Sequence, residues 1–263
     1  MIIRKAIHEA SLELKKNNIQ TSVLDSEILM SKVLNKKREF IFLNSEETLS
    51  KDNFDYFKKL INERSSGKPI AYITGKKFFW KDEFNVNQNV LIPRPDTELI
   101  VDQILKIYRN KKSLTVLDIG VGSGCILLSL LKEKEGFVGT GVDISSECIK
   151  ICKKNIKKLK LNNKIRLFKS DVDNFSYGKY DLIISNPPYI KKTDLKYLER
   201  DIMKFEPRLA LDGGLDGLSE IRKVIKKSSE LIKKNGKLVL EIAFDQKRKV
   251  KSLLIDKGFY INN

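Results

Sequence analysis

The sequence predicts an α/β protein: a doubly wound parallel sheet with a small N-terminal helical domain and a β-hairpin linker. Three observations support this fold class. Hydrophobic residues recur at helical spacing up to about residue 66, short apolar runs alternate with helical segments from residue 114 onward, and a glycine-rich turn follows the first of those runs. At 263 residues the chain is long enough for about two domains. We expect a helical domain over 1–74, a linker over 75–93 and a sheet domain over 94–263.

Several amphipathic helices are expected in the N-terminal domain. Apolar side chains three and four positions apart lie on one face of a helix and can pack into a common core. No group of residues typical of catalysis occurs in this region. The three clearest apolar stripes are Ile3, Ile7, Ala10 and Leu14; Ile28, Leu29, Val33 and Leu34; and Phe54, Phe57, Leu60 and Ile61.

The helical pattern breaks near residue 70, at Pro69–Gly75. Two apolar segments follow, Phe78–Trp80 and Asn85–Ile92, separated by the polar residues Lys81–Glu83. Such a pair of runs predicts a β-hairpin. The run Leu99–Tyr108 then has helical spacing again, so a helix is expected to lead into the sheet domain.

The sheet domain is expected to contain parallel strands joined by helices. Short apolar runs that alternate with helical segments are typical of this arrangement, and ligands bind at the carboxyl ends of such strands. The expected strands span 114–119, 138–143, 165–169, 180–185 and 237–242.

Asn186-Pro187-Pro188-Tyr189 directly follows the fourth of these strands. The two prolines stiffen the turn, so its carbonyl groups and the Asn186 side chain are left to accept hydrogen bonds. Tyr189 adds an aromatic face. These groups suit a planar amino or amide nitrogen, which is a poor nucleophile and must be oriented toward an electrophile. The motif therefore indicates methyl transfer to such a nitrogen, although a proline-rich loop with a packed tyrosine is the simpler alternative.

A glycine-rich turn, Gly120-Val121-Gly122-Ser123-Gly124, connects the first strand to the apolar helical stretch Cys125–Leu131. Glycines at this place allow a ligand to approach the backbone at the helix N-terminus. In the dinucleotide-binding fingerprint the third glycine follows the second by three positions, whereas here Gly124 follows Gly122 by two. The spacing therefore argues against a dinucleotide.

Asp143 ends the second strand, 21 residues after Gly122. A carboxylate at this place can accept hydrogen bonds from the two hydroxyls of a ribose, which S-adenosylmethionine and a dinucleotide both carry. An alternative is that Asp143 caps the helix that begins near Ser145 and Ser146. The two roles do not exclude each other.

The composition, 41% hydrophobic and 32% charged, is typical of a globular protein, and the net charge is +17. The positive charge has two interpretations: a nucleic-acid partner, or a lysine-rich surface, since 41 lysines and ten arginines are spread along the chain. The chain has no apolar run of about 20 residues and no N-terminal signal sequence, so we expect a cytoplasmic protein with no membrane partner.

The cysteines and the histidine do not suggest a metal site. Cys148 and Cys152 lie four residues apart on one expected helix, where we interpret them as small core residues. Cys125 follows the glycine turn, and His8, the one histidine, lies in the first helix. We therefore expect neither a bound metal nor a catalytic triad that depends on histidine.

Four segments together resemble the HemK/PrmC family. They are Ile92-Pro93-Arg94-Pro95-Asp96-Thr97-Glu98, the glycine turn, Asn186-Pro187-Pro188-Tyr189-Ile190, and Glu206-Pro207-Arg208-Leu209-Ala210-Leu211-Asp212-Gly213-Gly214. Members of this family use S-adenosylmethionine to methylate the glutamine of the GGQ motif in class 1 peptide chain release factors. The similarity covers about residues 20 to 258, including Pro69–Gly75.

The resemblance implies a Rossmann-like class I S-adenosylmethionine-dependent methyltransferase domain over 94–263, with residues 1–74 as the domain that recognises the substrate. It also implies site residues by position. Asn186, Pro187 and Tyr189 match catalytic positions, and together with Pro188 they match the glutamine-binding motif. The matching cofactor contacts are Gly120, Val121, Gly122, Ser123, Gly124, Asp143, Val172 and Asn186.

The chain departs from the family pattern at two places. Val172 stands where the family often has an aromatic residue beside the adenine. The family fold also ends in an antiparallel hairpin, whereas Gly258–Asn263 reaches only the start of its first strand. The sequence is then either a fragment or a protein with a differently built sheet edge, and an unpaired edge would reduce stability.

The function expected from the sequence is methylation of the side-chain amide of the GGQ glutamine, which would modulate translation termination. Release factors are the expected partners, nucleic acid is not required, and we expect a monomer. One alternative is a nucleic-acid methyltransferase that acts on adenine N6 or guanine N2, for which the basic charge would be suitable. Another is a module that binds the cofactor without catalysis.

Overall fold

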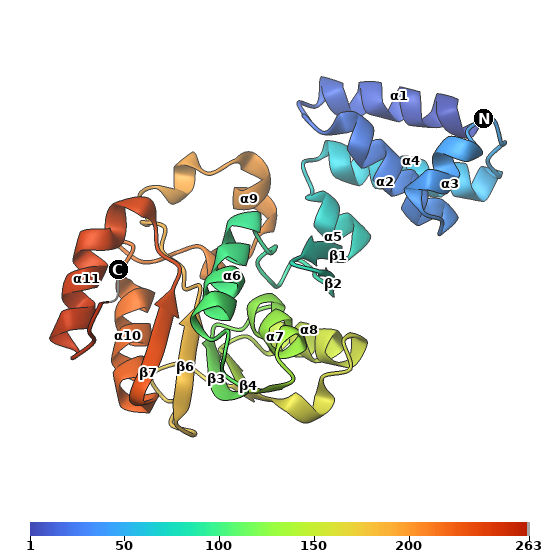
Figure 1. Cartoon of the computed structure of the whole chain (residues 1–263). Coiled ribbons are helices and arrows are strands. Elements are labelled where there is room, and N and C mark those ends of the chain that lie inside the picture. The colour runs from blue at the N-terminus through green and yellow to red at the C-terminus, as the bar shows by residue number, and fades with distance from the viewer. Residues whose placement is uncertain (262–263) are drawn as a thin grey trace. The chain divides into compact units, whose positions relative to one another are not determined.

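The computed structural model describes residues 1–261 and divides into two compact units. The first consists of Met1–Gly75 and Glu199–Phe205, and the second of Lys76–Leu198 and Glu206 onward. Figure 1 shows the helices of residues 1–75 in blue and cyan, the helix of residues 200–205 in orange, and the sheet of the second unit in green to red.

The first unit is built from helices, and all of them except the short helix over residues 200–205 supply residues to one apolar core. Leu14, Leu29 and Met30 in this core are completely shielded from solvent. The three predicted apolar stripes are confirmed, because each occurs in one of the longer helices and supplies residues to this core. The helices are α1 (Ile3–Lys16), α2 (Ser22–Leu34), α3 (Arg38–Leu43), α4 (Lys51–Ser65), α5 (Ile70–Thr74) and α9 (Arg200–Phe205).

Two parts of this unit differ from the prediction. Pro69–Gly75 was expected only to interrupt helical structure, but Ile70–Thr74 forms the one-turn helix α5, which ends where Gly75 adopts a φ of +78°. Helix α3 was not predicted, because six residues are too short to show a helical period. Both helices add buried residues, Ile41 and Ile73, to the core.

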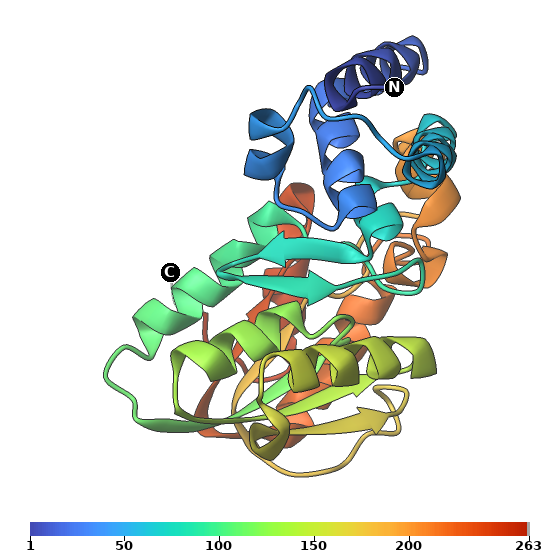
Figure 2. The same ribbon diagram turned by 90° about the vertical axis from the view of Figure 1, so that its right-hand side faces the viewer.

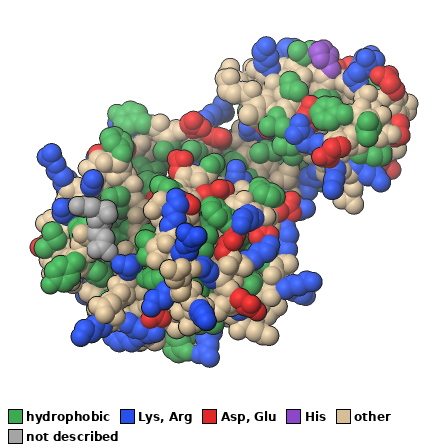
Figure 3. Space-filling model, viewed as in Figure 1, with side chains coloured by type: hydrophobic (Ala, Val, Ile, Leu, Met, Phe, Trp, Pro, Cys, Tyr) green, Lys and Arg blue, Asp and Glu red, His purple; other side chains and the backbone are tan. Residues whose placement is uncertain are grey.

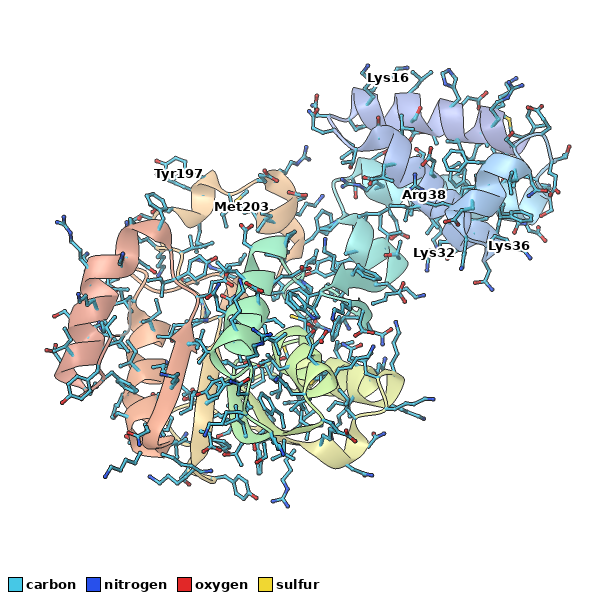
Figure 4. The ribbon with its side chains drawn as sticks, viewed as in Figure 1. Lys16, Lys32, Lys36, Arg38, Tyr197 and Met203 are labelled. Carbon is cyan, nitrogen blue, oxygen red and sulfur yellow. The ribbon has the colours of Figure 1, made fainter. Side chains whose placement is uncertain are left out.

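Most basic side chains of the first unit are exposed, but Arg64 is buried and pairs with Asp25. Figure 4 labels Lys16 at the end of α1, Lys36 between α2 and α3, and Arg38 at the start of α3, and all three are exposed. Arg38 is paired with Glu27 on α2. In Figure 3, blue lysine and arginine side chains alternate with red acidic ones over the visible surface. On this face the basic side chains are dispersed among acidic ones, as on a lysine-rich solvated surface.

The second unit contains a five-stranded parallel sheet in the order β5-β4-β3-β6-β7, which confirms the predicted doubly wound sheet. Helices α6, α7 and α8 cover one face of the sheet and α10 covers the other. The strands are β3 (Ser113–Ile119), β4 (Gly136–Asp143), β5 (Ile165–Lys169), β6 (Tyr180–Ser185) and β7 (Ile232–Leu240); the helices are α6 (Glu98–Ile107), α7 (Cys125–Glu133), α8 (Ser146–Lys158), α10 (Ser219–Leu231) and α11 (Lys247–Asp256).

The predicted hairpin is present, but its second strand was placed wrongly. Strands β1 (Lys76–Phe79) and β2 (Asp82–Asn85) pair with Phe79 opposite Asp82, so the turn is Trp80-Lys81 and not Lys81–Glu83. Trp80 adopts a φ of +57°, which permits this two-residue turn. Figure 2 shows the hairpin beside α7 and α8. Contacts between β2 and α8 agree with this placement.

The C-terminal end of the sheet also differs from the prediction. β7 begins five residues earlier than expected, because Ile232 already pairs with Tyr180 before a bulge, and it ends at Leu240 rather than at residue 242. Residues 259–261 form no strand, and the rest of the predicted C-terminal strand, residues 262–263, lies outside the described residues. In the described sheet, β7 is therefore an edge strand.

Candidate functional site

A cavity of about 410 Å³ lies at the carboxyl ends of the central strands. Its walls come from the residues that directly follow β3, β4, β5 and β6, which is where a parallel sheet of this kind binds its ligand. Parts of the segments 89–97 and 207–224 complete it.

The cavity brings together most of the predicted site residues. Gly124 and Tyr189 are the two that do not line it. The predicted residues that do are Gly120, Val121, Gly122, Ser123, Asp143, Val172, Asn186, Pro187 and Pro188.

Gly124 holds the glycine turn against the helices behind it. Its φ is +84°, and a Cβ atom at this position would lie 2.7 Å from the Sγ atom of Cys152 and 2.9 Å from Cδ1 of Leu128. Its amide donates to the carbonyl of Val121 at 2.7 Å, directly before α7 begins. The third glycine therefore shapes the turn without contacting the cavity.

Asp143 fixes two backbone segments at the cavity wall. Its Oδ2 accepts a hydrogen bond from the Gly122 amide at 2.9 Å, and its Oδ1 accepts one from the Ser145 amide at 2.9 Å. Burial raises the pKa of Asp143, although these two amides act in the opposite direction. The N-cap of α8 is Ser145, whose hydroxyl accepts from the Cys148 amide, so the helix-cap interpretation of Asp143 is wrong.

Asp118, on β3, is a buried carboxyl group for which no role was predicted from the sequence, and it does not line the cavity. It is 1% exposed, and neither carboxyl oxygen has a hydrogen-bond partner of normal geometry among the described residues. Burial, and secondarily the charge of Asp143, raises the pKa of Asp118 to about 8. The sequence signal that pointed to it was a carboxyl group inside the strand Leu114–Ile119, whose other residues, apart from Thr115, are apolar.

The side chain of Asn186 presents its acceptor to the cavity. Its amide nitrogen donates to Oγ1 of the buried Thr97 at 3.3 Å, which sets the direction of the amide group. Among the described residues, no donor is bonded to Oδ1 of Asn186 or to the backbone carbonyls of Asn186 and Pro187. Three acceptor oxygens around this turn are thus available to a ligand.

A buried ion pair connects two of the segments that carry the family resemblance. Arg94 pairs with Glu206, whose side chain is only 1% exposed, and Glu206 also accepts from the Ile92 amide at 3.4 Å. Both segments belong to the motifs that resemble the family, but no role within them was predicted from the sequence. Their roles become visible only when residues 112 positions apart meet at the cavity.

The cavity is acidic although the chain is strongly basic. Its two basic side chains are both neutralised, Arg94 by Glu206 and Lys223 by Glu220. Asp143 and Asp171 also line it. Such a wall disfavours a pyrophosphate and favours a ligand with a positive charge.

The segment that follows Tyr189 is partly exposed. Tyr197 in the 3-10 helix Leu195–Tyr197 is 77% exposed, and Figure 4 shows its side chain pointing away from the ribbon. Within residues 1–261, no cluster of three or more potential metal ligands occurs, and no helix has the length and apolar character needed to cross a membrane.

Comparison with family models identifies two domains in the chain. Residues 5–75 match the model of the PrmC N-terminal domain, and residues 95–217 match that of the methyltransferase small domain. The second range contains three of the four segments on which the family resemblance depends and the Pro95–Glu98 part of the fourth, and the hairpin lies between the two ranges.

Curated relatives are similar over nearly the whole chain. A release factor glutamine methyltransferase from Buchnera aphidicola is 38% identical over 98% of this chain and 92% of its own length. The enzyme of the same name from Caulobacter vibrioides is 36% identical over 97% and 88%. A bifunctional methyltransferase from Rickettsia conorii is 33% identical over 99% of this chain, which spans only 55% of that relative's length.

Proposed function

We propose that this chain, which belongs to the release factor glutamine methyltransferase family, methylates the side-chain amide nitrogen of the GGQ glutamine in class 1 release factors. This reaction would modulate translation termination. Because the chain spans about half the length of the bifunctional relatives, the proposal concerns only the activity named for the release factor enzymes.

The observation that carries the proposal is the set of free acceptors at Asn186 and Pro187. A glutamine amide has two N–H bonds, and Oδ1 of Asn186 and the Pro187 carbonyl can each accept one. Held in this way, the weakly nucleophilic nitrogen is oriented for attack, and the positive charge that develops on it is stabilised. After the transfer, water can take the extra proton, so no general base is required.

The residues around the cavity fit S-adenosylmethionine, which supplies an electrophilic methyl group on a sulfonium centre when it is bound. We assign the ribose hydroxyls to Asp143 and the backbone contacts to Gly120, Val121, Gly122 and Ser123, with Gly124 shaping the turn. Val172 would pack on the adenine side without aromatic stacking. The acidic wall is compatible with the cationic cofactor.

The domain roles are part of the proposal. Residues 1–74 would recognise the release factor, 75–93 would link the two domains, and 94–263 would carry out the transfer. A single glutamine offers little surface for selectivity, so a second binding surface is needed. The nucleic-acid alternative is not favoured, because the relatives are named for a protein substrate. We further propose a cytoplasmic monomer.

The experiment is methyl transfer from labelled S-adenosylmethionine with three acceptors offered in parallel: intact release factor, the same factor with the GGQ glutamine replaced by alanine, and RNA or DNA. We expect label only in the intact factor. Activity that persists while salt rises from 50 to 200 mM supports a protein substrate, because binding through six or more phosphate contacts would weaken by roughly a thousandfold. Label in the glutamine-free factor or in nucleic acid would refute the proposal.

A further inference from the structure

Tyr189 is held from two directions by the segment that follows β7. Its hydroxyl donates to Oε1 of Glu241 at 3.2 Å, and its backbone carbonyl accepts from Nε2 of Gln246 at 3.0 Å. Tyr189 is the last residue of the turn that carries Asn186 and Pro187. The position of that turn at the cavity is therefore connected to two side chains more than 50 residues later in the chain.

Glu241 lies beside the start of the turn. It is the first residue after β7, and its amide donates to the Ser185 carbonyl at 3.1 Å, which continues the pairing of β7 with β6. Its Oε2 is buried and has no partner among the described residues, so the Tyr189 hydroxyl is the one donor to its carboxyl group there. A carboxyl group with one buried, unpaired oxygen strongly favours keeping the donor that it has.

The phenol of Tyr189 is suited to remain that donor. Burial, followed by the negative charge of Glu241, raises the pKa of Tyr189 to about 12, so its hydroxyl is protonated at neutral pH. The aromatic ring packs against the cluster that contains Leu218, Ile221 and Val250 rather than lining the cavity. The hydrogen bond from the Tyr189 hydroxyl to Glu241 thus fixes the end of the ring that is farthest from the backbone.

Gln246 fixes the backbone of the same residue. It is 3% exposed, and besides Tyr189 its Nε2 donates to the Gly217 carbonyl at 3.0 Å, while its Oε1 accepts from the Ala243 amide at 3.1 Å. A Cβ atom at Gly217 would lie 2.5 Å from the Tyr189 carbonyl oxygen. Only glycine at this position allows the close approach on which the bond between Gln246 and Tyr189 depends.

We propose that Glu241 and Gln246 are positioning residues for methyl transfer: by holding the hydroxyl and the carbonyl of Tyr189, they set where Asn186 and Pro187 present their acceptors. This inference rests on the proposed function. Neither residue lines the cavity, so each acts through Tyr189 and not by contact with cofactor or acceptor. Their loss should reduce the rate of the bound complex rather than the affinity for either substrate.

The test compares Glu241→Leu, Glu241→Gln, Tyr189→Phe and the double variant Glu241→Leu/Tyr189→Phe in the full chain. Glutamine keeps a carbonyl oxygen that can accept from the phenol, whereas leucine does not. For each protein, kcat and the KM for release factor are measured, together with the Kd for S-adenosylmethionine and the melting temperature. Asp181→Asn is the matched control, because Asp181 is a hydrogen-bonded carboxylate at the opposite end of β6.

We expect Glu241→Leu and Tyr189→Phe each to lower kcat about tenfold, with both KM and the cofactor Kd within roughly twofold of wild type. The double variant should lose no more than about a further twofold, since both changes remove the same contact. Glu241→Gln should recover most of the rate.

Gln246→Leu should likewise lower kcat while leaving the cofactor Kd unchanged. Asp181→Asn should lower the melting temperature with kcat unchanged.

Additive losses in the double variant, or a Glu241→Gln rate as low as that of Glu241→Leu, would overturn the positioning role. Failure of wild type to label release factor would instead refute the proposed function, and the same rate ratios would be measured on whichever acceptor is labelled.

A readout that needs no acceptor is the NMR resonance of isotope-labelled Tyr189. It should shift in Glu241→Gln and not in Asp181→Asn, and an unshifted resonance would refute the contact itself.

Discussion

The two ends of strand β6 use polar groups in opposite ways. At its amino end, Oδ2 of Asp181 accepts from the Thr115 amide at 2.8 Å, the Thr115 hydroxyl at 2.7 Å and the Lys233 ammonium at 2.9 Å. At its carboxyl end, Oδ1 of Asn186 and the Pro187 carbonyl accept no hydrogen bond from any described residue, and both residues line the cavity.

This difference in hydrogen bonding indicates that one end of β6 contributes to stability and the other to ligand binding. Buried or partly buried polar groups are normally paired, so acceptors left without a donor at one end of a well-ordered strand are available for a ligand. At the Asp181 end, by contrast, the bonds to Oδ2 connect β3, β6 and β7, and no residue there lines the cavity. We therefore expect substitutions at the carboxyl end to affect turnover or ligand affinity, and substitutions at the amino end to affect the free energy of unfolding.

The largest effect is expected for Asn186→Ala. It removes one of two acceptors proposed to hold the substrate amide, and the loss of one preorganised polar contact costs on the order of 3 kcal/mol in the barrier, or about a hundredfold in rate. Single-turnover methyl transfer measures the rate, and calorimetric titration measures cofactor affinity, which should change far less. Turnover close to that of wild type would remove Asn186 from the proposed mechanism.

Asp143→Ala should come next, with a weaker cofactor affinity. The loss of charge-assisted hydrogen bonds to the ribose should cost about 2 kcal/mol, or roughly thirtyfold in Kd. Asp143 also accepts hydrogen bonds from the Gly122 and Ser145 amides, so its removal could disturb the backbone. Asp143→Asn is therefore measured as well, because asparagine keeps an acceptor oxygen but has no charge. The exposed Asp173→Ala is the control. An unchanged Kd in Asp143→Ala would leave that residue only its role in holding the backbone.

Asp118 should make stability depend on pH. The pKa of Asp118 is raised to about 8 in the folded protein, above its ordinary value of 3.8, so the folded state binds a proton that the unfolded state has lost between these pH values. Stability should fall as pH rises from about 4 to 8. Asp118→Asn should weaken this dependence, which melting curves at pH 5 and pH 8 will show. Parallel pH profiles for the two proteins would contradict the shifted pKa.

The smallest effect on function is expected for Asp181→Asn. The amide can still accept a hydrogen bond but loses its charge, so unfolding should become easier by about 1 kcal/mol. Chemical denaturation measures this change. Turnover and cofactor affinity should equal those of wild type, because Asp181 lies at the end of β6 away from the cavity. A lower kcat in Asp181→Asn, measured under conditions where the protein is folded, would contradict the proposed difference between the two ends of β6.

Much of this arrangement could be predicted from the sequence, because it depends on local patterns. The apolar runs gave the five strands, and the motifs placed Asn186 and Asp143 at strand ends, where both line one cavity. The glycine turn was predicted correctly as a connection between β3 and α7. In each case a pattern of at most a few neighbouring residues determines the local geometry.

The contacts that complete the site could not be predicted in this way, because they join distant parts of the chain. Glu241 and Gln246 meet Tyr189 only after β7 pairs with β6, and Glu206 reaches Arg94 only in the folded unit. The hairpin register depended on the positive φ of Trp80, which a bulky aromatic residue rarely adopts. Tertiary packing, not local propensity, determined each of these features.

The most direct test of the central claim is to find the atom that receives the methyl group. Release factor incubated with this protein and S-adenosylmethionine is digested, and tandem mass spectrometry locates the modification. We predict one added methyl group on the side-chain nitrogen of the GGQ glutamine, and none when the Asn186→Ala protein is used for the same time. A methyl group on any other residue, or equal modification by the Asn186→Ala protein, would contradict the account.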